Sequence, residues 1–147
     1  MNSTAASTSS KPSRSTDAAA ELRALKLEKL RRLERRAEPL RDFIPRVSPG
    51  MVPPDHLAPL LDAFERIRRG DRVRVCVSVP SQHGKSQTVL HALAWILASR
   101  PTWPVIYLTY QQEQSDDQSH KARAIARAAN VDLAADRANL RMWRPSA

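Results

Sequence analysis

The chain has 147 residues and carries 24 Lys and Arg against 15 Asp and Glu, which gives a formal net charge of +9. This length allows one domain of ordinary size, and no run approaches the roughly 18 apolar residues of a membrane-spanning helix, so no integral membrane function is expected. Cys76 is the single cysteine, which excludes a disulfide framework and a cysteine-built zinc site and fits a reduced, cytoplasmic setting. The charge indicates a polyanionic partner such as nucleic acid.

The first 45 residues form two segments of different composition. Residues 1–20 are rich in Ser, Thr and Ala and contain no aromatic residue. They lack the apolar side chains that would offset the entropy of ordering, so we predict a disordered arm. Residues 21–45 place leucines on one stripe at the helical period, among many Lys and Arg, and predict a basic amphipathic helix that Pro45 ends. Four roles stay open for it: DNA contact, a membrane surface, packing on a neighbouring subunit, or an ordinary solvated helix.

Residues 46–147 contain three further segments with helical periodicity and recognisable ends. Pro59 falls in the first turn of one helix and Gly70 stops it. The last helix begins near Ser115, whose spacing to Gln118 predicts a capping box. The predicted helices run over 55–69, 85–99 and 115–130.

Two runs rich in β-branched residues precede the second and third of these helices. They cover residues 72–79 and 104–110 and predict strands. A strand–helix–strand–helix order indicates right-handed crossovers in a parallel sheet. The predicted fold class is therefore α/β, with a partial parallel sheet and flanking helices. Two strands leave edges uncovered, so we expect marginal stability.

A phosphate-binding motif lies where the first predicted strand meets its helix. A P-loop reads Gly, four residues, then Gly-Lys-Ser/Thr, and the last three positions match Gly84, Lys85 and Ser86, with Val79 in place of the first glycine. A strand-to-helix turn offers backbone N–H groups to an anion, Lys85 reaches the β- and γ-phosphates, and the Ser86 hydroxyl ligates Mg²⁺. The sequence therefore predicts a P-loop NTPase sheet that binds ATP and Mg²⁺.

Histidines and tryptophans give weaker signals. His83 and His91 stand eight residues apart with no carboxylate at ligand spacing, so we predict surface or loop histidines and no metal site. Trp95, Trp103 and Trp143 are scattered along the chain, and core packing explains them at least as well as base stacking.

A succession of short motifs resembles the start of the ATPase domain of tailed-phage terminase large subunits, the motors that pump DNA into procapsids. The resemblance covers about residues 43–144, and terminases typically have Pro-x-x-His-Gly-Lys-Ser without the first P-loop glycine. The matching motifs are Phe43-Ile44-Pro45, Pro54-Asp55-His56, Arg68-Arg69-Gly70-Asp71, the run 77–86, and Ile106-Tyr107-Leu108-Thr109-Tyr110 followed by Ser119 and Arg123.

Carried over position by position, the resemblance implies an ATP site formed by the loop, with Mg²⁺ held through Ser86. The residues so assigned are Ser81, Gln82, His83, Gly84, Lys85 and Ser86. The family often has an arginine within this loop, where this chain has Ser81 and Gln82. Arg123 is the candidate substitute, acting across subunits, and no other catalytic residue is predicted. His56 lies where such motors recognise adenine.

The resemblance also shows what the sequence lacks. Phosphoryl transfer to water needs an acidic Mg²⁺ partner at a strand end and a carboxylate that orients the water. After Tyr110, Asp132 and Asp136 lie in a stretch without a preceding apolar strand, and the terminase nuclease domain is absent. We therefore expect an N-terminal fragment that binds ATP without hydrolysing it. In the intact motor, the implied partners are double-stranded DNA, other terminase subunits, the portal and other copies of the chain, in the cytoplasm of a bacterial host cell.

Two other functions stay open. One is a non-enzymatic nucleic-acid-binding or adaptor protein that uses the helix of residues 21–45. The other is a fragment of a different P-loop ATPase or helicase. An acidic strand end in adjacent coding sequence would favour the terminase, whereas activity retained after Lys85→Ala would favour the adaptor.

Overall fold

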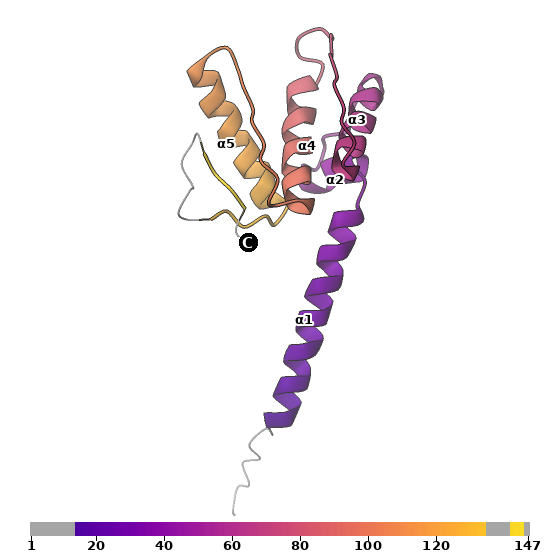
Figure 1. The fold of residues 1–147 in the computed structure, drawn as a ribbon, viewed down its shortest axis with the longest axis vertical. Helices are drawn as coiled ribbons and strands as arrows, with labels where there is room; N and C mark the ends of the chain where they lie inside the picture. Colours follow the sequence, from indigo (N-terminus) through magenta and orange to yellow (C-terminus); the bar gives the residue numbers. More distant parts are fainter. Residues whose placement is uncertain (1–13, 135–141, 146–147) are drawn as a thin grey trace, which may run out of the picture. The chain divides into compact units, whose positions relative to one another are not determined.

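The computed structural model describes residues 14–134 and 142–145, and the chain forms two compact units, Met1–Glu34 and Arg35–Ala147. Five α-helices and one short 3-10 helix occur in the described residues (Figure 1). In this part of the chain, no helix is both long and apolar enough to cross a bilayer.

The first unit consists mainly of helix α1, Arg14–Ala37. It begins before residue 21, so the disordered arm predicted over 1–20 is wrong for residues 14–20, where Ala18, Ala19 and Ala20 favour a helix. Residues 1–13 of the predicted arm lie outside the described residues. All five leucines of α1 are about half exposed or more: Leu22, Leu25, Leu27, Leu30 and Leu33.

The single helix predicted over 21–45 is wrong, because the chain breaks at Pro39. Pro39 is extended (φ −64°, ψ 150°) and precedes a second helix, α2, Leu40–Val47. A proline supplies no backbone N–H and disfavours helical backbone at the residue before it, so α1 ends ahead of it. Pro45 lies inside α2 and does not end it.

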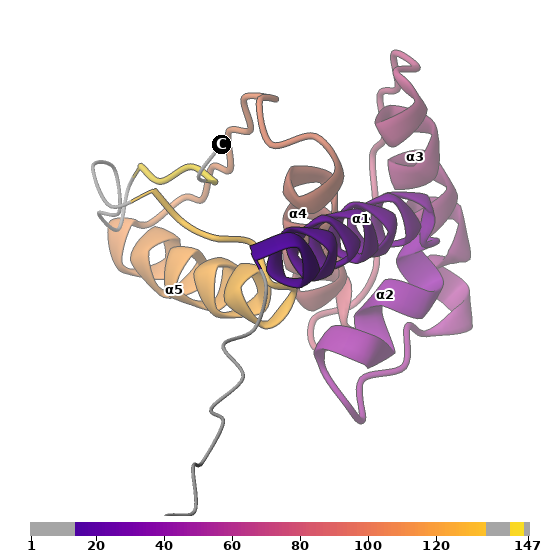
Figure 2. The same cartoon turned by 90° about the horizontal axis from the view of Figure 1, so that it is seen from below.

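Helix α4, Lys85–Ser99, is the centre of the second unit and has the bounds that the sequence predicts. It contacts α2, α3 (Ala58–Arg69) and α5 (Gln112–Ala128), so α3 and α5 cover different sides of it (Figures 1 and 2). The 3-10 turn Asp55–Leu57 leads into α3. The largest fully buried side chains are Trp95, Phe43, Leu40, Ile44, Leu57, Leu90, His91 and Thr88.

The ends of α3 confirm the sequence signals, whereas the start of α5 does not. Pro59 lies in the first turn of α3, and Gly70 caps its end in the left-handed conformation, with φ 102°. The predicted capping box at Ser115 is wrong. The backbone N–H of Ser115 donates to the Gln111 carbonyl at 3.1 Å, so Ser115 already lies inside the first turn of α5.

The predicted parallel sheet, and with it the α/β P-loop fold, is wrong for this chain. Residues 72–79 and 104–110 run as extended traces (Figure 1) but form no strand, and the one bridge within the described residues joins Leu133 to Pro145. The first segment packs with α3 and the start of α4, the second with α4 and α5. β-branched residues favour extended backbone locally, but a sheet needs hydrogen bonds between strands, and no backbone hydrogen bond joins these two described segments.

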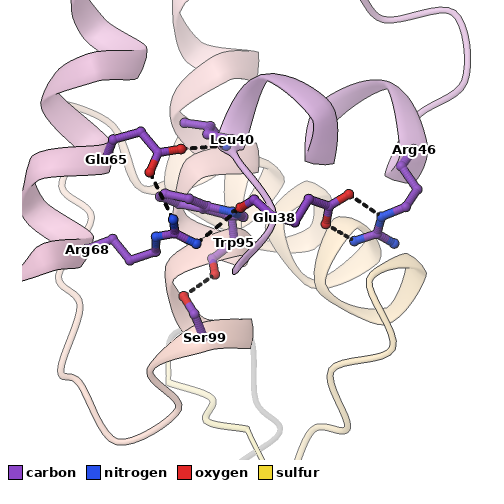
Figure 3. Close-up of polar contacts among 7 residues, drawn as sticks. All are labelled: Glu38, Leu40, Arg46, Glu65, Arg68, Trp95 and Ser99. Atoms are coloured by element: carbon purple, nitrogen blue, oxygen red, sulfur yellow. Dashed lines mark hydrogen bonds and ion pairs between the residues drawn. The ribbon is translucent and has the colours of Figure 1, made fainter. Parts of the chain in front are cut away.

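A polar network joins the break at residues 38–39 to α3 and α4 (Figure 3). The Arg68 guanidinium donates to the Glu38 carbonyl at 3.1 Å and to the Glu65 carboxylate at 3.0 Å, and it stacks 4.2 Å from the centre of the Trp95 ring. The Trp95 indole N–H donates to the same Glu38 carbonyl at 2.9 Å. Glu65 also accepts the backbone N–H of Leu40 at 2.8 Å, and so caps α2 from α3.

The Glu38 side chain holds the far end of α2. Both of its carboxylate oxygens accept hydrogen bonds from Arg46 at 2.7 Å. This two-point pairing raises the pKa of Arg46 above its ordinary value, mainly through the hydrogen bond, with partial burial acting in the opposite direction. The short α2 is therefore fixed at both ends by side chains that the helical periodicity of the sequence does not reveal.

Candidate phosphate-binding site

The loop that precedes α4 turns through two residues with left-handed backbone. Gln82 has φ 65° and Gly84, the N-cap of α4, has φ 79°. A Cβ atom added at Gly84 would lie 3.4 Å from Cγ of Pro54, so the loop packs closely on the segment ahead of α3. Both the backbone conformation and this close approach favour glycine at position 84.

The first turn of α4 has backbone donors that no side chain caps. The first helical bond runs from the Thr88 N–H to the Gly84 carbonyl at 2.9 Å, which leaves the N–H groups of Lys85, Ser86 and Gln87 ahead of it. No acidic residue lies in this turn. Free N–H groups and the positive end of the helix dipole together favour an anion at this position.

Lys85 and Ser86 lie in different surroundings although they are adjacent in sequence. Lys85 is half-buried and lines a cavity of about 340 Å³, of which it is the one charged lining residue. The other walls are apolar and come from α3, from Val89 of α4 and from Val73, Val75 and Val77. Ser86 is exposed, as are Ser81, Gln82 and His83. The structure therefore gathers the predicted loop residues at one helix end, with the lysine towards α3.

Two histidines meet beside the loop. His83 Nδ1 lies 2.9 Å from the Ser81 carbonyl oxygen, which only accepts, so Nδ1 carries the hydrogen and closes the turn. The His56 ring meets the His83 ring edge to face, with 5.7 Å between ring centres and 72° between planes. His56, expected near the adenine, is thus next to the loop. The two histidines are 27 positions apart in sequence, so no local pattern could have paired them.

Arg123 is not brought to this loop. It lies half-buried on α5, its Nε is buried without a hydrogen-bond partner, and no described contact joins it to residues 81–86. The described residues also contain no group of three or more His, Cys, Asp and Glu that could hold a metal ion. The Ser86 hydroxyl is the one side-chain oxygen of the loop that the sequence predicts as a Mg²⁺ ligand.

His91 is buried and not at the surface, so that part of the histidine prediction is wrong. Its Nδ1 hydrogen bonds to the Gln87 carbonyl at 2.8 Å, and its Nε2 lies 2.8 Å from the Ser48 hydroxyl. Because the Gln87 carbonyl oxygen only accepts, Nδ1 carries the hydrogen of the neutral ring, and Nε2 therefore accepts from the Ser48 hydroxyl. Burial lowers the pKa of His91, partly opposed by the Gln87 hydrogen bond. The position of His91 on the apolar face of α4, next to Leu90, is the feature of the sequence that could have indicated its burial. His83, by contrast, is an exposed loop histidine as predicted.

A second cavity, of about 940 Å³, lies between α4, α5 and the extended segment 104–108. Leucines of α4 form one wall, and small polar residues of α5, such as Ser115 and Ser119, contribute to another. Trp103 and Trp143 also line it, whereas Trp95 is fully buried in the core. This cavity shares no lining residue with the smaller one beside Lys85.

Comparisons with known proteins found no relative: no family model, no curated protein and no solved structure matches the chain. The geometry of the loop and the motifs in the sequence therefore indicate what the chain can bind.

Proposed function

We propose that the chain binds the phosphates of ATP at residues 81–86. The observation that carries this proposal is the first turn of α4, which is uncapped, free of acidic residues and preceded by a left-handed glycine. Three adjacent backbone N–H groups at a helix start form an anion site with no further side chain. Lys85 adds a positive charge next to it, and its four-carbon stem lets the ammonium reach a phosphate.

Magnesium enters this proposal with the nucleotide. Mg²⁺ keeps most of its water and phosphate ligands and needs one or two protein oxygens, and the Ser86 hydroxyl is exposed beside the loop. Hydrolysis would also require carboxylates that hold the metal and orient a water. We identify no such pair at the loop among the described residues, so we expect ATP binding without turnover.

The wider role that we propose is that of a piece of a DNA-packaging motor of the terminase type. The motifs over residues 43–144 support it, since they include the terminase form of the loop and not only the tripeptide Gly84-Lys85-Ser86. Double-stranded DNA, other terminase subunits and the portal are the corresponding partners, and the cytoplasm of a bacterial host is the predicted setting.

The test is Mg-ATP binding by the full chain, measured by calorimetry for the wild type, Lys85→Ala and Lys121→Ala. Lys121 is an exposed lysine on α5, paired with Asp117 at 2.6 Å, and its replacement removes the same charge away from the loop. A lost charge-assisted hydrogen bond costs about 1.5–3 kcal/mol, so Lys85→Ala should weaken binding about 10- to 100-fold. Lys121→Ala should leave it unchanged.

Two results would contradict the nucleotide site. One is a folded wild-type chain that binds no Mg-ATP. The other is an equal loss of affinity in both lysine variants, which would indicate non-specific attraction to the net charge of the chain. Retained helical circular dichroism in each variant excludes unfolding as the cause.

A second function, nucleic-acid binding through α1 without any nucleotide, is favoured by a separate observation. The basic residues Arg23, Lys26, Lys29 and Arg31 are all exposed on this helix. Lys and Arg on an exposed helix neutralise phosphates regardless of base sequence. DNA binding that persists in Lys85→Ala would show that the two activities are separate.

A further inference from the structure

The extended segment 104–110 exposes three large apolar side chains in alternation. Ile106, Leu108 and Tyr110 are 83%, 84% and 82% exposed. Single exposed apolar residues are ordinary, but a row of three on one side of an extended segment forms a continuous stripe, and such stripes mark interaction surfaces. We call Ile106, Leu108 and Tyr110 the apolar stripe.

The same segment also borders the second cavity. Residues 104–108 line the cavity of about 940 Å³ together with residues of α4 and α5, so Ile106 and Leu108 border it as well as Val105 and Tyr107. Ile106 and Leu108 nevertheless stay 83% and 84% exposed, whereas Tyr107 is half-buried, so the apolar stripe remains open to solvent beside the cavity.

The backbone of this segment also has no partner within the described residues. No backbone hydrogen bond involves residues 105–108, and the Thr109 hydroxyl bonds only locally, to the Gln111 carbonyl at 2.9 Å. The run Val-Ile-Tyr-Leu-Thr-Tyr has high β-propensity, no charge and no proline after Pro104. Stacked copies of six-residue segments with this composition form paired sheets whose faces interdigitate without water.

Charge decides which occupant fits the stripe. The chain carries a net charge of +9, yet residues 101–112 contain no Asp, Glu, Lys or Arg. An acidic partner attracted by the net charge would find no complementary group here, whereas a second copy offers an identical uncharged surface. We propose that the apolar stripe packs against the same stripe of a second copy of this chain, about a two-fold axis.

The size of the contact sets its strength. Three side chains from each copy would bury at most about 1,000 Å² in total even if fully enclosed, so the contact does not exceed the lower limit for a specific interface. The dimer is therefore weak. Because both copies are positive, their repulsion opposes association at low ionic strength and is screened as salt is added. Association should therefore strengthen with salt, the opposite of a contact with an acidic or nucleic-acid partner.

The experiment is sedimentation velocity on the full chain from micromolar to millimolar concentration, at about 0.1 M and about 0.5 M salt. The variants are Leu108→Lys, with a charge in the stripe, and Val52→Lys, with the same charge at another exposed apolar position (76% exposed). Wild type and Val52→Lys should dimerise with similar dissociation constants, and more tightly at high salt. Leu108→Lys should weaken the dimer at least tenfold.

Three outcomes would overturn the proposal. The first is a wild-type chain that stays monomeric at the highest concentration and salt. The second is a dimer that Leu108→Lys and Val52→Lys affect equally. The third is association that weakens as salt rises, which would assign the contact to opposite charges. Because Leu108 is exposed, its variant keeps the fold, and Ile106→Lys provides a second, independent substitution in the stripe.

Discussion

His91 is the one described histidine that the core encloses, at 2% exposure. Its ring joins two elements, because Nε2 accepts from Ser48 after α2 and Nδ1 donates to Gln87 within α4. Both nitrogens are satisfied only in the neutral form with the hydrogen on Nδ1. A proton added to Nε2 would place a charge in this buried position, and this is why the pKa of His91 is lowered.

This geometry predicts a loss of stability on mild acidification. The folded-state pKa lies below the unfolded value of about 6.5, so the unfolded chain binds the proton more readily. The contribution of neutral His91 to the free energy of unfolding is fully present above the pKa of the unfolded state. It is lost as the pH falls below that value towards the lower pKa of the folded state. The slope for this one proton is at most about 1.4 kcal/mol per pH unit.

Urea denaturation at several pH values between about 7.5 and 5.5 checks this prediction. His91→Leu removes the titrating group and should flatten the pH dependence, although it lowers stability throughout by deleting two hydrogen bonds. His120→Gln alters an exposed histidine and should keep the wild-type slope. Equal slopes in the wild type and His91→Leu would contradict the assignment.

The polar network between α2, α3 and α4 stabilises the unit at the level of elements. We expect Arg68→Met to lower the free energy of unfolding by about 2 kcal/mol, because it removes two charge-assisted hydrogen bonds and the stacking on Trp95. The adjacent exposed arginine is the matched control, and Arg69→Met should change stability by less than about 0.5 kcal/mol. Equal effects in urea denaturation of the two variants would contradict the role of the network.

The elements that the sequence predicts well are those with local end signals. Helix α3 has Pro59 in its first turn and Gly70 at its stop, and α4 follows Gly84, so both were found with nearly their observed bounds. The extended segments 72–79 and 104–110 were recognised as extended, but a sheet depends on partners distant in sequence, which propensity does not encode. The break at Pro39 was missed because the leucine stripe continues past it.

The same distinction applies to the candidate site. The loop itself could be predicted, because Gly84, Lys85 and Ser86 are consecutive and the helix start follows from them. The packing of Gly84 on Pro54 and the meeting of His56 with His83 join segments about 30 residues apart. Such contacts follow from the packing of α3 on α4, so local patterns along the chain do not supply them.

At the scale of the whole molecule, the net charge of +9 includes many basic residues in the first unit and at the α1–α2 junction. We expect double-stranded DNA to bind mainly through α1. Replacing Arg23, Lys26 and Lys29 by Gln should weaken binding and lower the slope of log affinity against log salt by about 0.9 for each phosphate that is no longer neutralised. Fluorescence anisotropy with a labelled duplex at several salt concentrations measures both quantities.

The control for this experiment removes three exposed arginines from the second unit, Arg69, Arg72 and Arg74. It changes the net charge of the chain by the same amount. A specific role for α1 requires a clearly larger decrease in affinity in the α1 variant. Similar decreases in both would mean that DNA is attracted by overall charge, with no preferred surface.

Cys76 gives the molecule a natural attachment point for a probe. It is the one thiol in the chain, it is exposed, and its neighbours Val75 and Val77 both line the cavity that contains Lys85. A thiol-reactive fluorophore would therefore label each copy once, without an engineered cysteine. Cys76 itself does not line this cavity, so the emission would report movement of the segment 72–79 when nucleotide binds, and no substitution in the sequence would be needed.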